Sequence, residues 1–107
     1  MFIVPHIGHV YTAIIADAVH RFQLLLGKEE TVFSTGTDEH GTKIQEAAAK
    51  CGSPLPEYCS AISKQYRSLF DTCNIAYTDY VRTTEDRHLK EVEKFWVIIK
   101  QCYILKF

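Results

Sequence analysis

A loop near the start of the chain carries two histidines and a glycine, Pro5-His6-Ile7-Gly8-His9. It follows a short apolar stretch and opens a helix, where backbone N–H groups and the helix dipole favour an anion. His6 and His9 lie three apart, on one side of the first turn. Their imidazoles can donate hydrogen bonds to phosphate oxygens as charge builds there, and Gly8 lets a flat ring approach the backbone. We interpret this loop as a phosphate-binding site rather than as an ordinary polar helix start.

A second loop combines acidic residues with histidine between two glycines, in the run Gly36-Thr37-Asp38-Glu39-His40-Gly41-Thr42. A carboxylate placed here can receive an ammonium group, and His40 can hold a substrate or orient its neighbour. Acidic residues also stabilise a helix N-terminus by themselves. That effect explains Asp38 or Glu39 separately but not the whole run, so the pattern favours a ligand-binding loop.

A third loop begins at Arg82 and is less informative. Arg82 could reach a ligand, but the pattern favours a charge at a strand end, followed by a helix cap from Thr83 or Thr84. His20 and His88 fall within helical patterns, and we expect both on solvated helix surfaces.

The elements that must position these loops alternate between strands and helices. Short β-branched or aromatic runs predict strands, and apolar residues three and four apart predict helices. We expect strands at 2–4, 31–34 and 80–82, and helices at 9–26, at 42–51, from 53 onwards and after 84, with a new element starting at 103. This order is typical of an α/β fold with a parallel sheet covered by helices. Ligands bind such sheets at the carboxyl ends of the strands, where loops 5–9, 36–41 and 82–85 should meet.

Apolar periodicity predicts which side of each long helix faces the core. Three helices are expected to bury a stripe: Val10, Ile14, Ala18, Phe22 and Leu25 in the first; Ala61, Ile62, Tyr66, Leu69 and Phe70 in the third; Leu89, Val92, Trp96 and Ile99 in the last.

Composition excludes several classes of protein. With 107 residues, of which 47% are hydrophobic and 12% aromatic, the chain suits one small globular domain and not a disordered segment. A net charge of −1 leaves no basic face to hold a nucleic-acid backbone. The cysteines form no C-x-x-C pair, so we expect reduced thiols and no structural metal. No apolar window matches a membrane span or a targeting signal, so we expect a soluble chain without a membrane partner.

Together these segments resemble the class I aminoacyl-tRNA synthetases, and among them the methionyl-tRNA synthetases of bacterial and mitochondrial type. The resemblance runs from Pro5 to about Tyr103. It rests on four segments: Pro5-His6-Ile7-Gly8-His9, the run from Phe33 to Gly41, Ile44-Gln45 with Ala47-Ala48, and Arg82-Thr83-Thr84-Glu85.

The resemblance implies a partial Rossmann-like fold and a set of roles. Residues 1–107 would be the first half of the catalytic domain, truncated at both ends, with a connecting domain starting near 103–107. The activity would be activation of methionine by ATP, with Mg²⁺ expected, and transfer to tRNA(Met). His6, Gly8 and His9 would contact ATP, with the two histidines catalytic. Asp38 would meet the methionine α-ammonium group, and His40 belongs to the same methionine site. The parent enzyme would lie in the mitochondrial matrix, although the absence of a transit peptide leaves the cytoplasm open.

Departures from the family pattern keep other functions open. No Tyr precedes His6, and the K-M-S-K-S loop that grips ATP is absent. We therefore expect the chain alone to be inactive, with Phe95 and Trp96 partly exposed. One alternative is a non-catalytic ATP-binding or interaction fragment. Another is a metal site built from the histidines and Asp38, with the ligand set His6, His9, Asp38 and His40.

Overall fold

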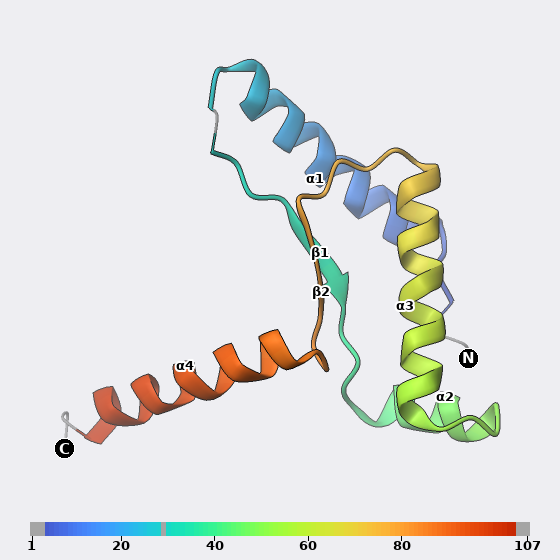
Figure 1. Ribbon diagram of the computed structural model, residues 1–107. Helices are drawn as coiled ribbons and strands as arrows, with labels where there is room; N and C mark the ends of the chain where they lie inside the picture. Colours follow the sequence, from blue (N-terminus) through green and yellow to red (C-terminus); the bar gives the residue numbers. More distant parts are fainter. Residues whose placement is uncertain (1–3, 29, 105–107) are drawn as a thin grey trace.

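Four helices and two strands make up the computed structural model, which describes residues 4–28 and 30–104. The elements in chain order are α1 Ile7–Leu25, β1 Ser34–Thr37, α2 Thr42–Lys50, α3 Leu55–Thr72, β2 Asp79–Arg82 and α4 Asp86–Ile104 (Figure 1). The α/β class and the four predicted helices are confirmed. Most of the predicted strand at 2–4 lies outside the described residues. The element predicted from 103 is instead the last turn of α4.

The two strands lie side by side and run parallel, with Ser34 opposite Asp79 and Thr37 opposite Arg82 (Figure 1). Because both strands end at the same edge, the loops that follow them start next to each other. Gly36 lies opposite Val81, and a Cβ atom at this position would fall 1.8 Å from the Val81 carbonyl oxygen. The close approach of the strands therefore depends on glycine.

The first described strand starts later than the sequence predicted. We expected strand 31–34 and a loop from Gly36, but Gly36 and Thr37 are paired in β1. Phe33 is buried, and its N–H donates to Oγ1 of Thr78 at 2.9 Å instead of to a partner strand. β-Branched and aromatic residues marked the approach to the sheet, whereas the register with β2 decides where pairing begins.

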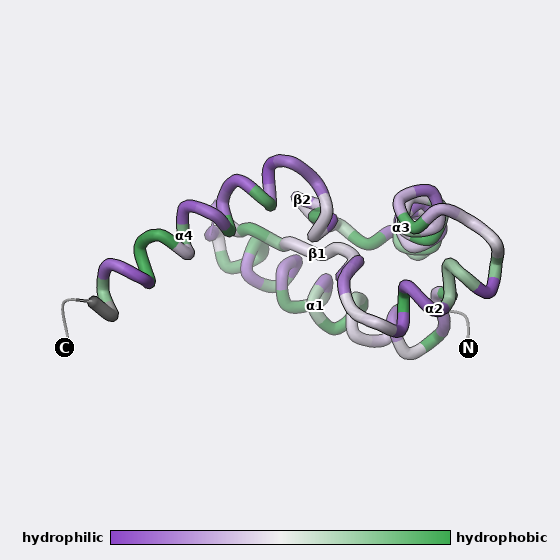
Figure 2. Tube along the Cα trace, turned by 90° about the horizontal axis from the view of Figure 1, so that it is seen from below, coloured by the Kyte–Doolittle hydropathy of each residue, from purple (hydrophilic) through white to green (hydrophobic). Residues whose placement is uncertain are grey.

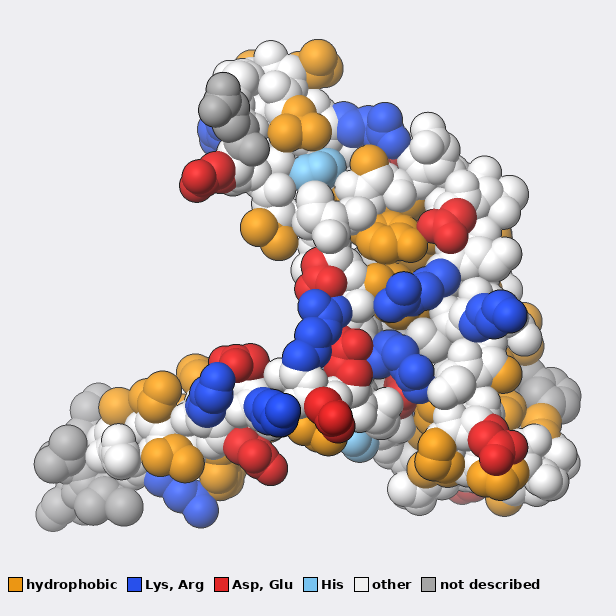
Figure 3. Space-filling view, in the orientation of Figure 1, with side chains coloured by type: hydrophobic (Ala, Val, Ile, Leu, Met, Phe, Trp, Pro, Cys, Tyr) orange, Lys and Arg blue, Asp and Glu red, His pale blue; other side chains and the backbone are white. Residues whose placement is uncertain are grey.

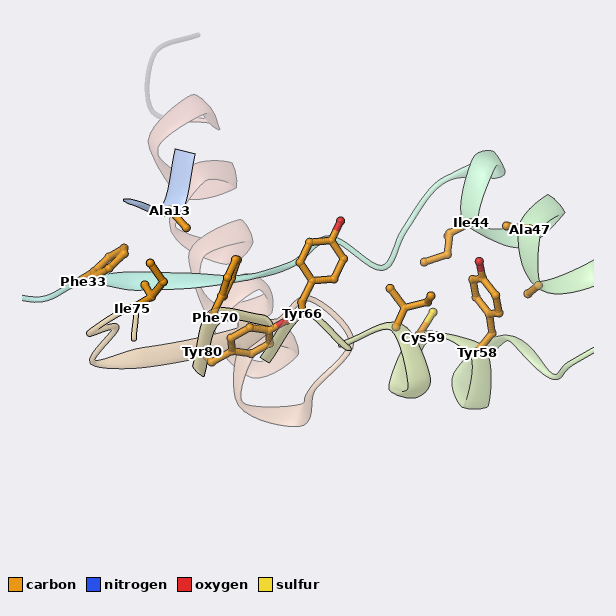
Figure 4. Close-up of a cluster of buried hydrophobic side chains, with 12 residues drawn as sticks. Ala13, Phe33, Ile44, Ala47, Tyr58, Cys59, Tyr66, Phe70, Ile75 and Tyr80 are labelled. Atoms are coloured by element: carbon orange, nitrogen blue, oxygen red, sulfur yellow. The ribbon is translucent and has the colours of Figure 1, made fainter. Parts of the chain in front are cut away.

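A cluster of apolar side chains lies between the helices and the sheet (Figure 4). The helix α3 packs against α1, α2 and β1 and supplies the largest share of this cluster. Ile62, Tyr66 and Phe70 are buried, which confirms most of the stripe predicted for this helix. The backbone of α3 is therefore fixed against both the sheet and the start of α1.

The buried side of α1 differs from the predicted one. Val10 is buried as expected, but its buried companions are Ala13 and His20, whereas the other predicted apolar positions Ile14, Phe22 and Leu25 are exposed. Asp17 explains the rotation. Its Oδ1 accepts from Ala76 N–H at 2.8 Å, which ties the Asp17 side of the helix to the loop after α3.

His20 is buried, so its prediction as a surface residue was wrong. It lies on the same side of α1 as Asp17, and its ring packs on Phe33 with centroids 5.6 Å apart. The hydrogen bond between Asp17 and Ala76 thus orients α1 so that the imidazole of His20 is buried, whereas the apolar pattern had predicted burial of Phe22 and Leu25.

The last helix extends away from the rest of the molecule (Figures 1 and 2). Its apolar stripe was predicted to face a core, yet Leu89, Val92 and Trp96 are exposed, and apolar side chains gather on its visible surface (Figure 3). The expected exposure of Phe95 and Trp96 is confirmed. The radius of gyration of 17.2 Å exceeds the roughly 13 Å of a compact domain of this size. The apolar periodicity of α4 indicates a helix face that another element could cover, but no described element packs on that face to bury it.

No helix within residues 4–28 and 30–104 is long and apolar enough to cross a membrane.

We predict that Gly36→Ala destabilises the fold. The added Cβ would clash with backbone of β2, which cannot move as a flexible side chain would. Overpacking of this kind costs about 1–3 kcal/mol of unfolding free energy. Urea unfolding followed by circular dichroism should show the loss, and Gly27→Ala is a control for strain at glycine away from the sheet. An unchanged midpoint for Gly36→Ala would contradict the close strand approach.

Candidate active site

The two histidines of the first loop are held by the backbone at the start of α1. His6 occupies the N-cap position and accepts a hydrogen bond from Gly8 N–H at Nδ1, at 3.1 Å. His6 N–H in turn donates to Nδ1 of His9 at 3.2 Å. A ring nitrogen that accepts a hydrogen bond carries no proton. Each neutral imidazole therefore bears its proton on Nε2.

The second histidine is also held by the core. Its Nε2 lies 3.1 Å from the hydroxyl oxygen of Tyr66, and its ring lies 3.8 Å from the ring of His6 between centroids. Burial, together with repulsion from His6, lowers the pKa of His9 below its ordinary value. His9 is therefore neutral at pH 7, and its uncharged Nε2–H lies beside the hydroxyl of Tyr66 near the N-terminus of α1.

The second loop directs its side chains alternately outward and inward. Asp38 and His40 are exposed, with 80% and 62% of their side-chain surfaces accessible, whereas the side chain of Glu39 is 1% exposed. Asp38 Oδ1 accepts from the N–H of His40 at 3.1 Å, which fixes the turn between them. Glu39 thus anchors the loop while its two neighbours face outward.

The buried carboxylate of Glu39 is fully paired. Arg82 donates to it twice, from Nε to Oε1 at 2.7 Å and from its terminal nitrogen to Oε2 at 3.0 Å. Hydroxyl groups of Thr37 and Thr84 donate to the same carboxylate. Burial acts to raise the pKa of Glu39, but these hydrogen bonds outweigh it and hold the pKa below the usual range. The carboxylate is therefore charged at neutral pH.

Thr83 joins the two loops a second time. Its Oγ1 accepts from Glu39 N–H at 2.9 Å and lies 3.0 Å from Nδ1 of His40. Thr83 and Thr84 were predicted to cap α4, and this was wrong because both hydroxyls face the loop after β1. The carbonyl of Glu85 accepts the first helical N–H groups instead, from His88 and Leu89.

The structure brings part of the predicted site into one cavity. His9 and Asp38 both line a cavity of about 260 Å³, together with Gly36, Thr37, Glu39, Ile44, Cys59, Ile62 and Tyr66. His40 lines a neighbouring cavity of about 410 Å³, on the side of Arg82 and Thr84. His6 and Gly8, at the start of α1, are exposed to solvent. The expected meeting of the three loops is therefore observed at this edge.

Sequence reasoning missed four residues that shape this edge: Glu39 as an anchor, Arg82, Thr83 and Tyr66. Two opposite charges at the ends of neighbouring strands, Glu39 and Arg82, were the available signal, because parallel strands bring their carboxyl ends together. Tyr66 was assigned to the core stripe of α3, and its sequence position carries no sign of the hydroxyl's contact with His9.

The metal alternative finds no support in this geometry. Within residues 4–28 and 30–104, no group of three or more His, Cys, Asp and Glu residues is arranged to hold a metal ion. His6, His9, Asp38 and His40 all belong to the described residues, and they are not gathered into such a group. His6 and His9 contact each other, as do Asp38 and His40, and no third member of the set joins either pair within the described residues.

Comparison with known proteins identifies the family. A family model described as tRNA synthetases class I (M) matches residues 3–106. This chain belongs to the methionyl class I tRNA synthetases. The mitochondrial methionine–tRNA ligase of Xenopus laevis is 50% identical over 103 residues, which cover 95% of this chain and 18% of that protein. The human mitochondrial ligase is also 50% identical, over 94% of this chain and 17% of its own length.

A solved structure shares the arrangement of this family member. Mycobacterium tuberculosis methionyl-tRNA synthetase in complex with methionyl-adenylate is 38% identical, with a TM-score of 0.75. The similarity covers 79% of this chain and 16% of that chain. The chain therefore spans less than a fifth of the length of each of these three relatives.

We predict that Glu39 makes acid stability depend on this site. Its folded pKa is lowered, so its contribution is complete above its unfolded pKa of about 4.3 and disappears as pH falls through the folded value. Glu39→Gln should cost about 3 kcal/mol of unfolding free energy at pH 7, because it leaves Arg82 unpaired.

Urea unfolding at pH 7 and at pH 2.5 measures this difference, with exposed Glu93→Gln as the matched control. The gap between the original chain and Glu39→Gln should narrow at the acidic pH. A gap of undiminished size there would contradict the role of the carboxylate charge.

Proposed function

We propose that this chain supplies the amino-terminal part of the site at which methionine is activated by ATP in a methionine–tRNA ligase. The observation that carries the proposal is the shared cavity of His9 and Asp38, at the N-terminus of α1 and the carboxyl end of β1. A carboxylate that suits an ammonium group thus lies beside donors that suit a phosphate. Relatives named methionine–tRNA ligase and a synthetase structure with methionyl-adenylate support this assignment.

The residues of the first loop fit the phosphate half of the reaction. In activation, a carboxylate oxygen of methionine attacks the α-phosphorus of ATP, and pyrophosphate leaves with the bonding electron pair. Negative charge then spreads over the phosphate oxygens in the transition state. The Nε2–H groups of His6 and His9 and the α1 N-terminus would stabilise this charge, while Gly8 would allow ATP to approach the backbone. Mg²⁺ would accompany ATP and neutralise part of its phosphate charge.

The residues of the second loop fit the amino-acid half. Asp38 is exposed, and among the described residues its carboxylate contacts the N–H and, at 3.9 Å, the Nδ1 atom of His40. A carboxylate in that state can accept hydrogen bonds from the α-ammonium group of methionine. His40, two residues on, would contact the same substrate from the neighbouring cavity. The transfer of the methionyl group to tRNA(Met) would follow, with residues outside this chain holding most of the tRNA.

The names of the relatives also bear on the cell compartment. The relatives from Xenopus laevis and human are named mitochondrial, and the Campylobacter jejuni relative is bacterial. We propose that the parent enzyme serves mitochondrial protein synthesis.

The proposal is tested in a hybrid enzyme. This chain would replace the matching 103-residue segment of the human mitochondrial ligase, and methionine-dependent ATP–pyrophosphate exchange would be measured. His9→Ala should lower kcat about 10²- to 10³-fold, as loss of a transition-state donor does. Asp38→Asn should mainly raise KM for methionine. His88→Ala, on α4, is the matched control and should leave both constants unchanged.

The hybrid also separates the proposal from the alternative of a non-catalytic fragment. If the hybrid supports no exchange while the purified chain still binds ATP by calorimetry, and His6→Ala weakens that binding, the fragment alternative is correct. Equal activity of the hybrid and its His9→Ala variant would overturn the catalytic assignment.

A further inference from the structure

The loop after β2 contacts the loop after β1 through two different sets of contacts. Arg82 and Thr84 donate hydrogen bonds to the carboxylate of Glu39, and these bonds anchor the loop after β1 at the sheet edge. Thr83 instead contacts the backbone of Glu39 and the ring of His40. The bonds to the Glu39 carboxylate explain how the loop is anchored. The Thr83 hydroxyl instead contacts a side chain of the proposed site, His40.

The hydroxyl of Thr83 has a defined direction. Its oxygen accepts from Glu39 N–H at 2.9 Å, so its own proton is free to donate. In the part of the chain that the structure describes, the recorded acceptor within reach is Nδ1 of His40, at 3.0 Å. When the hydroxyl donates to this nitrogen, the proton of the neutral imidazole lies on Nε2.

Asp38 has the opposite influence on the same ring. Its Oδ1 lies 3.9 Å from Nδ1 of His40, and a carboxylate favours a proton on the nitrogen nearest to it. The Thr83 contact has hydrogen-bond length, whereas the Asp38 contact does not. The Thr83 hydroxyl is therefore the nearer of the two groups to Nδ1 of His40.

We propose that Thr83 is a positioning residue of the site, whose hydroxyl holds His40 as the Nε2–H tautomer and so presents a hydrogen-bond donor to an oxygen atom of the ligand. Glu39 N–H fixes the hydroxyl, and the Glu39–Arg82 ion pair fixes Glu39. With Asp38 accepting from an ammonium group, His40 then donates beside it, which gives the loop one acceptor and one donor. This inference rests on the proposed function for the identity of the ligand but not for the tautomer.

The tautomer is measured first, on the purified 107-residue chain labelled with ¹⁵N-histidine. Long-range ¹H–¹⁵N NMR at pH 8 distinguishes the two neutral tautomers, and His40→Gln identifies the signals of His40 among the five histidines. The original chain should show His40 protonated on Nε2. Thr83→Val should give a mixture of tautomers, Thr83→Ser should restore the Nε2–H form, and Thr72→Val should change nothing.

Two results would overturn the role of Thr83. One is a His40 ring with its proton on Nδ1 in the original chain. The other is an unchanged tautomer in Thr83→Val. If Thr83→Val does not fold by circular dichroism, the original chain and Thr83→Ser still decide the matter, because both keep the hydroxyl and must both show the Nε2–H form.

The consequence for the ligand is measured in the hybrid enzyme. Thr83→Val should raise KM for methionine about fivefold with kcat little changed, the effect of one lost hydrogen bond in binding. Thr83→Ser should restore KM. An unchanged KM in Thr83→Val would reject the contact between His40 and the ligand. If the hybrid shows no methionine-dependent exchange at all, the proposed function fails, while the NMR result still decides the role of Thr83.

Discussion

The ion pair between the buried carboxylate of Glu39 and the partly buried Arg82 is the interaction on which the geometry of the site depends. A sheet of two short strands fixes the start of each loop but not its course. Burying a carboxylate costs free energy that only complete pairing offsets, and Glu39 receives donors from Arg82, Thr37 and Thr84. Asp38 and His40, on either side of this anchor, are exposed. Glu39, which is not expected to contact the ligand, thus determines the position of Asp38 and His40.

A common rule governs three histidines of this edge. Nδ1 accepts from Gly8 N–H in His6 and from His6 N–H in His9, and the proposed donor to Nδ1 of His40 is the Thr83 hydroxyl. Each ring then has its proton on Nε2, the nitrogen farther from the backbone. Two of the donors are amides at the start of α1, where they would be unpaired in any helix. The helix terminus therefore orients the imidazoles with groups that need a partner anyway.

Local patterns predicted the elements and the two chemical loops, but long-range contacts set their details. Types of element followed from periodicity, and H-x-G-H and G-T-D-E-H-G marked the loops that the structure brings together. The start of β1 depended on register with a strand far along the chain, and the buried face of α1 on a contact from Asp17 to Ala76. Arg82 was interpreted as a charge at a strand end because its partner, Glu39, is distant in sequence. The sequence neighbours of Glu39 and Arg82 do not indicate that these two residues pair.

The last helix shows which parts of the chain the site requires. Near its start, Arg87 binds Asp79, Glu85 and the carbonyl oxygen of Tyr80, so this end is tied to β2. Farther along, its apolar stripe is exposed, and a helix in water gains most of its stability from packing such a face. The contacts of Glu39, Thr83 and the two histidines of α1 all lie within residues 6–84. The order of the site is therefore set by α1, α3 and the two strands, whether or not the face of α4 is covered.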